Sequence, residues 1–179
     1  MKDGHRMSYL EGNHDFRLGK YFTEELGIAV HTEEIVENWN GRRIYMAHGD
    51  LGNPDEKGYR VLRSFLRQDL LHQAVSIVPQ KWLFAVGDRA SRLSRGFQKK
   101  VPPDEHKVRA IYRRSAEERF EQGYDVVIMG HTHIPDHYTK HVDGRQCDYY
   151  NTGDWVKNFT YLEFDGSQFY TRTHPVKQL

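Results

Sequence analysis

Residues 126–133 decide the fold class: Val126-Val127-Ile128-Met129, a short apolar run, is followed directly by Gly130-His131-Thr132-His133. β-branched and long apolar side chains that end at a glycine predict a buried strand with a sharp turn after it. Two similar runs lie at residues 7–10 and 43–47. Each also leads into a polar motif, Gly12-Asn13-His14-Asp15 after the first and His48-Gly49-Asp50 after the second.

Helices are predicted between these strands, so the chain is assigned to the α/β class. One is expected at residues 21–26, where Gly27 would stop it. Another is expected at residues 104–122, before Gly123, with apolar residues at helical spacing. Further on, Asp143-Gly144 and Asp165-Gly166 each separate two strand-like stretches, which predicts two antiparallel hairpins.

Composition excludes several classes of protein. The 179 residues are 37% hydrophobic and carry a net charge of +1, which suits one domain and argues against a generally basic nucleic-acid binder. No apolar run approaches the roughly 20 residues of a membrane span, and the start shows no signal peptide. Cys147 is the only cysteine, which rules out a disulfide within the chain. A reducing, cytoplasmic location is therefore expected.

A basic segment at residues 59–100 stands out from this neutral average. It has nine basic against two acidic residues, a net +7, so the rest of the chain carries −6. Apolar and basic residues alternate with helical spacing, which indicates amphipathic helices. One interpretation is a cap that receives acyl chains and touches an anionic membrane; the other is ordinary helices with solvated faces. The candidate substrate-binding residues of the cap are Arg60, Arg63, Arg92, Arg95 and Lys99.

The three polar motifs together indicate a metal site. Ligands bind at the carboxyl ends of strands in α/β sheets, and imidazole, amide and carboxylate groups there suit a divalent transition metal. His131 and His133 are two residues apart. They would share one face of a continuing strand, whereas in a tight turn they could bind two neighbouring metal ions.

These motifs, in this order, resemble the calcineurin-like metallophosphoesterase family. The resemblance implies a two-sheet β-sandwich flanked by helices and two divalent metal ions, commonly manganese and otherwise iron or zinc. It places Asn13, His48 and His131 on one metal and His133 on the other. His14 would stabilise charge on the scissile phosphate or donate a proton. Asp15 and Asp50 are expected to orient histidine rings.

Within the family, residues 10–16, 58–60 and 151–155 are most similar to UDP-2,3-diacylglucosamine diphosphatases. That likeness implies cleavage of a nucleotide-linked glycolipid to lipid X and UMP in lipid A synthesis. It also implies a peripheral position at the inner membrane, a helical cap at residues 59–100 and no specific nucleic-acid partner. The alternatives are another calcineurin-like phosphatase or phosphodiesterase, or an inactive fragment that binds anionic membrane or nucleic acid through the basic segment.

The family pattern begins with an Asp-x-His motif and a Gly-Asp motif, tens of residues before the Asn-His motif. Only twelve residues precede Asn13, so we expect residues 1–179 to form one N-terminally truncated domain. In that form one metal keeps only His133, activity is impaired and a partner chain could supply the other motifs. We also expect an exposed sheet edge and marginal stability.

Overall fold

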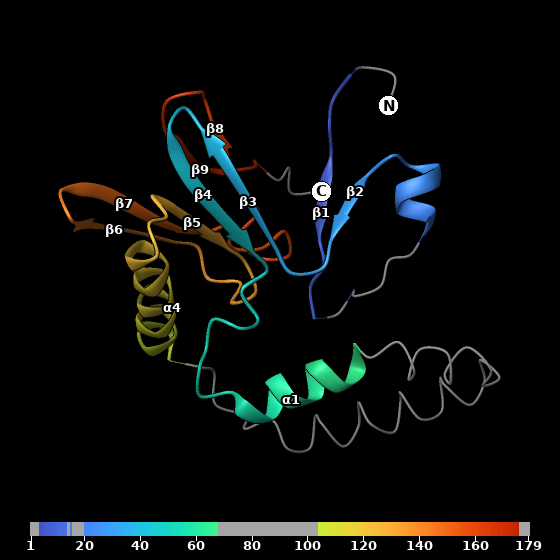
Figure 1. Ribbon diagram of the computed structural model, residues 1–179, viewed down its shortest axis with the longest axis horizontal. Coiled ribbons are helices and arrows are strands. Elements are labelled where there is room, and N and C mark those ends of the chain that lie inside the picture. Colours follow the sequence, from blue (N-terminus) through green and yellow to red (C-terminus); the bar gives the residue numbers. More distant parts are fainter. Residues whose placement is uncertain (1–3, 14, 16–19, 68–103, 176–179) are drawn as a thin grey trace. The chain divides into compact units, whose positions relative to one another are not determined.

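The computed structural model describes residues 4–13, 15, 20–67 and 104–175. The chain divides into two compact units, residues 1–53 with 105–179 and residues 54–104. The first unit contains every strand of the described residues (Figure 1). The mixed α/β class predicted from the sequence is confirmed.

A five-stranded mixed sheet forms the centre of the first unit. Its strand order is β3-β4-β5-β7-β6, with β4, β5 and β7 parallel and the two outer strands antiparallel to their neighbours. The strands are β3 (Glu34–Trp39), β4 (Arg42–Ala47), β5 (Val126–Met129), β6 (Asp136–Val142) and β7 (Arg145–Asn151). Side chains alternate between the two faces along β4, β5 and β7, so each face receives its own apolar cluster.

Helix α4 (Glu105–Glu121) covers one face of this sheet (Figure 1). Its buried residues Tyr112, Ala116 and Phe120 pack in one cluster with sheet residues that include Val127 and Tyr149. They recur at intervals of four residues, which places them on one side of the helix. The predicted helix and its apolar face are thus confirmed, and Gly123 follows it with φ +86°.

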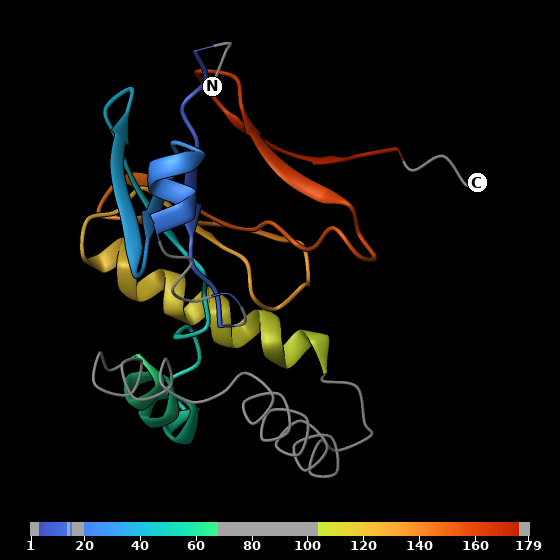
Figure 2. The same ribbon diagram turned by 90° about the vertical axis from the view of Figure 1, so that its right-hand side faces the viewer.

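A hairpin of β8 (Thr160–Phe164) and β9 (Phe169–Thr173) packs on the opposite face (Figure 2). Phe169 joins Ile44, Val126 and Tyr150 in a second buried cluster there. Trp39 stacks on Phe169 with the ring centroids 5.9 Å apart. The first unit is therefore layered as helix, sheet and strand pair.

A separate pair of parallel strands carries the first polar motif. In this pair β1 (Ser8–Leu10) is hydrogen-bonded to β2 (Ala29–His31). A short helix, η1 (Tyr21–Glu25), precedes β2 and is followed by Gly27 at φ +66°. The predicted strand at 7–10 and the helix that Gly27 was expected to stop are both present.

Asn-Gly and Asp-Gly turns join the hairpins. Asp143 and Gly144 have φ of +51° and +76°, the left-handed pair that a two-residue hairpin turn requires. Asn40 and Gly41 have φ of +53° and +83° and join β3 to β4 in the same way. The sequence analysis did not predict β3, although this Asn-Gly pair is a hairpin signal. Because β3 is mostly exposed and polar, the alternation of apolar and polar residues along it is weak.

The second unit is described in part. Helix α1 (Lys57–Leu66) confirms the predicted helical start of the basic segment and carries Arg60 and Arg63. Residues 68–103, with Arg92, Arg95 and Lys99, lie outside the described residues. Among the helices in the described ranges, none is long and apolar enough to cross a membrane.

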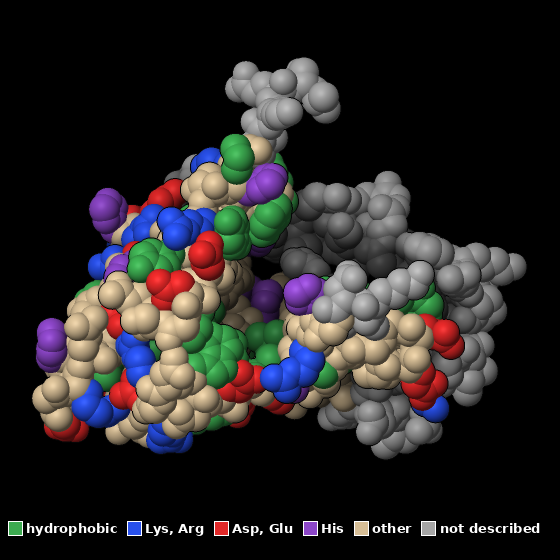
Figure 3. Space-filling model, turned by 90° about the horizontal axis from the view of Figure 1, so that it is seen from above, with side chains coloured by type: hydrophobic (Ala, Val, Ile, Leu, Met, Phe, Trp, Pro, Cys, Tyr) green, Lys and Arg blue, Asp and Glu red, His purple; other side chains and the backbone are tan. Residues whose placement is uncertain are grey.

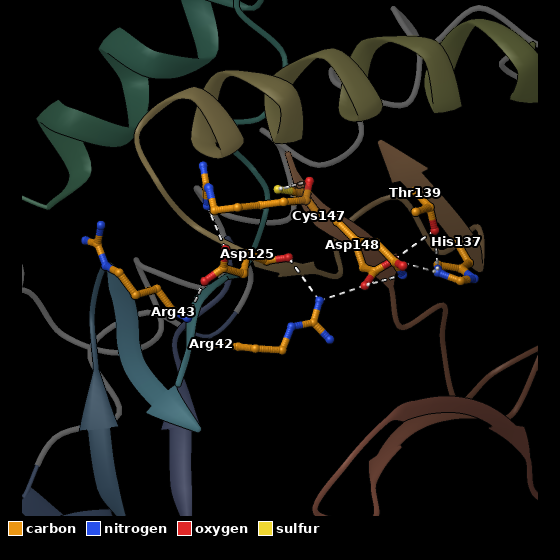
Figure 4. Close-up of polar contacts among 9 residues, drawn as sticks. Arg42, Arg43, Asp125, His137, Thr139, Cys147 and Asp148 are labelled. Carbon is orange, nitrogen blue, oxygen red and sulfur yellow. Dashed lines mark hydrogen bonds and ion pairs between the residues drawn. The ribbon is translucent and has the colours of Figure 1, made fainter. Parts of the chain in front are cut away.

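Two buried aspartates, Asp148 and Asp136, connect the outer strand β6 to neighbouring elements through hydrogen bonds. Asp148 of β7 accepts hydrogen bonds from Arg42 at 2.7 Å and Thr139 at 2.8 Å (Figure 4). Burial alone would raise the pKa of Asp148, but these hydrogen bonds outweigh it and lower the pKa. Asp136 at the start of β6 is held in a similar way by Arg109 and Arg113 of α4.

Candidate metal centre

Three strand ends bring the polar motifs together. His48 directly follows β4, His131 follows β5 by two residues, and Asn13 lies just beyond β1. Nε2 of His48 is 3.0 Å from Oδ1 of Asn13 and 3.2 Å from Nδ1 of His131. The structure therefore assembles three of the four side chains that the sequence analysis proposed as metal ligands.

The backbone fixes the two histidine-bearing turns against each other. Gly130 N–H donates to the carbonyl of His48 at 3.0 Å, which continues the pairing of β4 and β5 beyond the strands. Gly49, with φ +104°, allows the chain to leave β4 at this point. Asp50, which follows, is buried. The parallel pairing of β4 with β5 is therefore what places His48 beside His131.

The Gly130–His133 segment is a tight turn rather than a continuing strand. His131 and His133 both have left-handed backbone conformations, with φ of +64° and +60°, which are uncommon for residues other than glycine. Thr132 N–H donates to the carbonyl of Gly130 at 2.7 Å. Strained backbone of this kind is concentrated at functional sites. Of the two arrangements left open by the sequence, the structure shows the turn.

His133 has different surroundings from His131. Its side chain is 67% exposed, and its Nδ1 lies 4.0 Å from Oδ2 of Asp154. The described contacts do not join it to the Asn13–His48–His131 group. Asp154 is thus the neighbour that the structure gives His133, and the assignment of His133 to a second metal stays a prediction.

Asp15 holds the loop that carries Asn13. Its Oδ1 accepts a hydrogen bond from the backbone N–H of Gly12 at 2.8 Å, and its Oδ2 accepts one from the hydroxyl of Tyr9. The hydrogen bond to Asp15 raises the pKa of Tyr9 to about 12. Among the described contacts, Asp15 thus orders the loop around Asn13, whereas the sequence analysis expected it to orient a histidine ring.

Gly12 is close to His48 because no side chain intervenes. A Cβ at this position would lie 2.7 Å from Oδ1 of Asp15 and 3.0 Å from Cε1 of His48. Both distances are shorter than ordinary van der Waals contact, so any larger residue must push the loop away from the imidazole. The glycine of the Gly-Asn-His-Asp motif therefore sets the distance between Asn13 and His48.

Two asparagines support the histidine turn, a role that the sequence analysis missed. Asn151, at the end of β7, is buried and donates from Nδ2 to the carbonyl of Gly130 at 2.7 Å. Asn158 donates from Nδ2 to the carbonyl of His133 at 2.9 Å. The Asn-Thr-Gly-Asp-Trp stretch held a sequence signal for the first of these residues, but nothing in the sequence indicated which backbone atom it would bind.

The donor atoms of the Asn13–His48–His131 group fit a divalent cation. Ligand atoms that share one ion at roughly 2.1 Å stand about 3.0–3.4 Å apart. The two measured separations, 3.0 and 3.2 Å, lie in this range. Within the described ranges no group of three or more His, Cys, Asp or Glu side chains is arranged to hold a metal ion. The third donor atom proposed here is the amide oxygen of Asn13.

A groove of about 760 Å³ runs from His48 along the sheet face between β1 and β4. Leu10, Met46 and Ile128 supply apolar side chains to its walls, and Arg6 and Glu37 supply charged ones. Figure 3 shows the molecule hollowed with hydrophobic side chains inside and histidines beside the opening. The candidate metal centre therefore opens to solvent along one side.

The remaining predicted site residues cannot be related to this centre. His14 lies outside the described residues, as do Arg92, Arg95 and Lys99. Arg60 and Arg63 belong to the second unit, which is described separately from the unit that holds the centre. His137 and His141, which were expected at the surface, lie on β6, and His137 stacks on Tyr150 at 4.4 Å.

Two curated hydrolases resemble this chain over most of its length. A 164-residue match to UDP-2,3-diacylglucosamine hydrolase from Aromatoleum aromaticum is 27% identical and covers 92% of this chain and 66% of the relative. The protein of the same name from Psychromonas ingrahamii is 25% identical, with 91% and 66% covered. This chain thus spans just under two thirds of the length of these curated relatives.

Among solved structures, the crystal structure of zinc-complexed Vps29 from Entamoeba histolytica shares 16% identity at a TM-score of 0.31, with 93% of this chain and 74% of that chain covered. This likeness is too weak to add to the assignment. The model of the calcineurin-like phosphoesterase family matches residues 3–135, which include all three histidine motifs. Calcineurin-like phosphoesterases use divalent metals. The chain belongs to the calcineurin-like phosphoesterase family.

Proposed function

We propose that this protein is a metal-dependent phosphoesterase that cleaves the diphosphate of UDP-2,3-diacylglucosamine, giving lipid X and UMP. The observation that carries the proposal is the convergence of Asn13, His48 and His131 at 3.0 and 3.2 Å. These groups come from three separate strand ends, and their spacing suits ligands of one cation.

Asn13, His48 and His131 would hold one divalent ion, and His133 would contribute to a second. Manganese is the ion we favour, with iron or zinc as alternatives. When bound, such a pair polarises a phosphoryl group and activates water near neutral pH. The chain's own contribution is positional, because Asp15 orders the Asn13 loop and Asn151 and Asn158 support the histidine turn. His14 is proposed to offset charge on the phosphate oxygens.

Two observations support a lipid-linked nucleotide as the substrate. The relatives described above are named for their action on UDP-2,3-diacylglucosamine. The +7 segment at residues 59–100 combines arginines for a diphosphate with apolar residues for acyl chains, and its described helix α1 leaves Val61 and Phe65 exposed. We accordingly propose a cytoplasmic protein at the surface of the inner membrane, where this segment meets anionic lipid.

The test is release of UMP from UDP-2,3-diacylglucosamine with manganese and with a chelator present. Metal-dependent release of UMP from UDP-2,3-diacylglucosamine supports the proposal. Release of p-nitrophenol from bis-p-nitrophenyl phosphate, without any release of UMP, would point to another phosphodiesterase. Titration calorimetry with Mn²⁺ gives the number of ions bound, and no binding at all would rule out metal-dependent activity in this chain.

A further inference from the structure

The turn after β7 presents two large apolar side chains to solvent. Trp155 is 59% exposed and Val156 is 82% exposed. Among the residues whose side chains the structure describes, which leaves out Leu62 and Leu66, no other two consecutive residues are both large, apolar and exposed. Single exposed apolar residues are ordinary on protein surfaces, but a contiguous apolar patch indicates a contact site. Residues 155–157, with Lys157 completing the turn, are called here the 155–157 tip.

Asp154 holds the 155–157 tip in one conformation. Its Oδ1 accepts hydrogen bonds from the backbone N–H groups of Val156 at 2.7 Å, Lys157 at 2.5 Å and Asn158 at 3.2 Å. Asn158 in turn donates from Nδ2 to Oδ2 of Asp154 at 2.8 Å. These hydrogen bonds fix the backbone of the turn, and in this conformation its apolar side chains are exposed.

The side chains of the tip match those that favour a membrane surface. Tryptophan is enriched at membrane–water interfaces because its ring is apolar while its N–H remains polar, and lysine can extend its charge back to water. Trp155 is backed by aromatic rings, with Tyr161 at 6.3 Å and His174 at 5.6 Å between centroids. Val156 completes the apolar end.

The backbone N–H groups of the tip are already hydrogen-bonded within the protein, which suits an apolar medium. A backbone N–H without a partner costs several kcal/mol in hydrocarbon. The N–H groups of Val156 and Lys157 already bind Asp154, so moving the tip out of water breaks no hydrogen bond of theirs. Trp155 and Val156 form a patch of only two apolar side chains, whereas a specific protein interface needs about 800 Å² per partner, so a lipid surface is the better match.

We infer that the 155–157 tip inserts into the lipid–water interface of a membrane. This contact differs from the one proposed for the basic segment, because it depends on apolar burial and not on anionic lipid. Asn158 links the tip to the carbonyl of His133 at 2.9 Å. Insertion would therefore bring the candidate metal centre to the membrane surface, and this last consequence rests on the proposed function.

The test uses the full chain and needs neither metal nor substrate. Trp39→Phe with Trp82→Phe leaves Trp155 as the only tryptophan. With phosphatidylcholine vesicles at high salt, we expect its emission to shift to the blue and to be quenched by brominated lipid. In the otherwise unaltered chain, Val156→Asn should lower the vesicle partition coefficient about tenfold. Val36→Asn on β3, also an exposed valine, is the matched control and should leave it unchanged.

Several results would overturn the inference. They are unchanged emission of Trp155, equal losses in the Val156→Asn and Val36→Asn variants, or vesicle binding that high salt abolishes entirely. Sedimentation of the Val156→Asn chain with vesicles gives the answer even if the tryptophan variants fail to fold. Because no substrate is present, failure here leaves the proposed hydrolase activity to be judged by UMP release alone.

Discussion

Nδ1 of His131 lies 3.2 Å from Nε2 of His48, and the two imidazole rings cross at 75°. The residues are 83 positions apart in the sequence, and the parallel pairing of β4 with β5 brings them together. Oδ1 of Asn13 lies 3.0 Å from the same His48 nitrogen, so the spacing of these donor atoms suits the shared cation proposed above. This relationship underlies the first two predictions.

Replacing either histidine should remove metal binding. We expect His48→Ala and His131→Ala each to weaken Mn²⁺ binding by more than about a hundredfold, since even outer partners of metal ligands contribute 10–100-fold. Titration calorimetry measures this directly. His137→Ala is the control, because His137 stacks on Tyr150 away from the three motifs and should leave Mn²⁺ affinity unaltered. Equal affinity in all three variants would refute the assignment of the centre.

Gly12→Ala should weaken Mn²⁺ binding with little loss of stability. The added Cβ would lie 2.7 Å from Asp15 and 3.0 Å from His48, so the Asn13 loop must move away from the imidazole. We expect about a tenfold loss of affinity, in line with displaced metal-site geometry. Gly58→Ala is the control, since a Cβ there meets nothing within 4 Å. An unchanged Mn²⁺ affinity in Gly12→Ala would show that the loop position is not critical.

Gly153→Ala should destabilise the fold far more than Gly144→Ala. Both glycines have positive φ, +74° and +76°, so both variants carry the same backbone strain of about 1 kcal/mol. Only at Gly153 does the new Cβ meet neighbours, Thr160 Oγ1 at 2.2 Å and Pro135 Cγ at 2.7 Å. We expect about 2 kcal/mol of additional loss in unfolding free energy from this crowding. Urea titration of both variants measures the difference, and equal midpoints would contradict it.

Asp136→Asn should lower the free energy of unfolding by about 2–3 kcal/mol. Asp136 is buried and accepts hydrogen bonds from Arg109 at 3.0 Å and from Arg113 at 2.7 and 2.9 Å. Loss of its charge removes this anion from both guanidinium groups and leaves Arg109 only the more distant Glu105, at 3.6 Å. The figure is below that for a fully buried pair because both arginines are partly exposed. Glu163→Gln breaks the exposed pair with Arg172 and should change stability by less than about 0.5 kcal/mol.

Asp154 should make stability depend on pH in the acid range. Hydrogen bonds from the backbone N–H groups of Lys157, Asn158 and Val156 lower the pKa of Asp154 to about 2 from an ordinary 3.8. A lowered pKa in the folded state means that the ionised group stabilises the fold above about pH 4 and loses this effect as pH falls toward about 2.

The measurement is the urea midpoint of the unaltered chain and of Asp154→Asn between about pH 5 and pH 2. We expect the unaltered chain to be the more stable at the upper end and the two midpoints to converge as the carboxylate is protonated. Midpoints that stay a constant distance apart across this range would show that Asp154 does not carry the effect.

Most of the secondary structure could be predicted from the amino-acid sequence, which also pointed to Asn13, His48 and His131 as neighbours. Apolar runs ending at Gly or His marked β1, β4 and β5, and the helical spacing that ends at Gly123 marked α4. These signals are local, because burial of one face imposes a period of two or of 3.6 residues on the chain. The same locality explains why β3 was missed, since an exposed edge strand imposes no apolar period on Glu34–Trp39.

How these elements meet follows from the pairing of strands that are far apart in the sequence. The parallel register of β4, β5 and β7 places His48 beside His131 and sets Asn151 against the carbonyl of Gly130. The left-handed turn that separates His131 from His133 is likewise held by Asn158, 25 residues further along the chain. Such contacts join side chains to backbone atoms across long sequence distances. Because they depend on strand register and not on local spacing, the sequence could suggest candidate ligands but not their geometry.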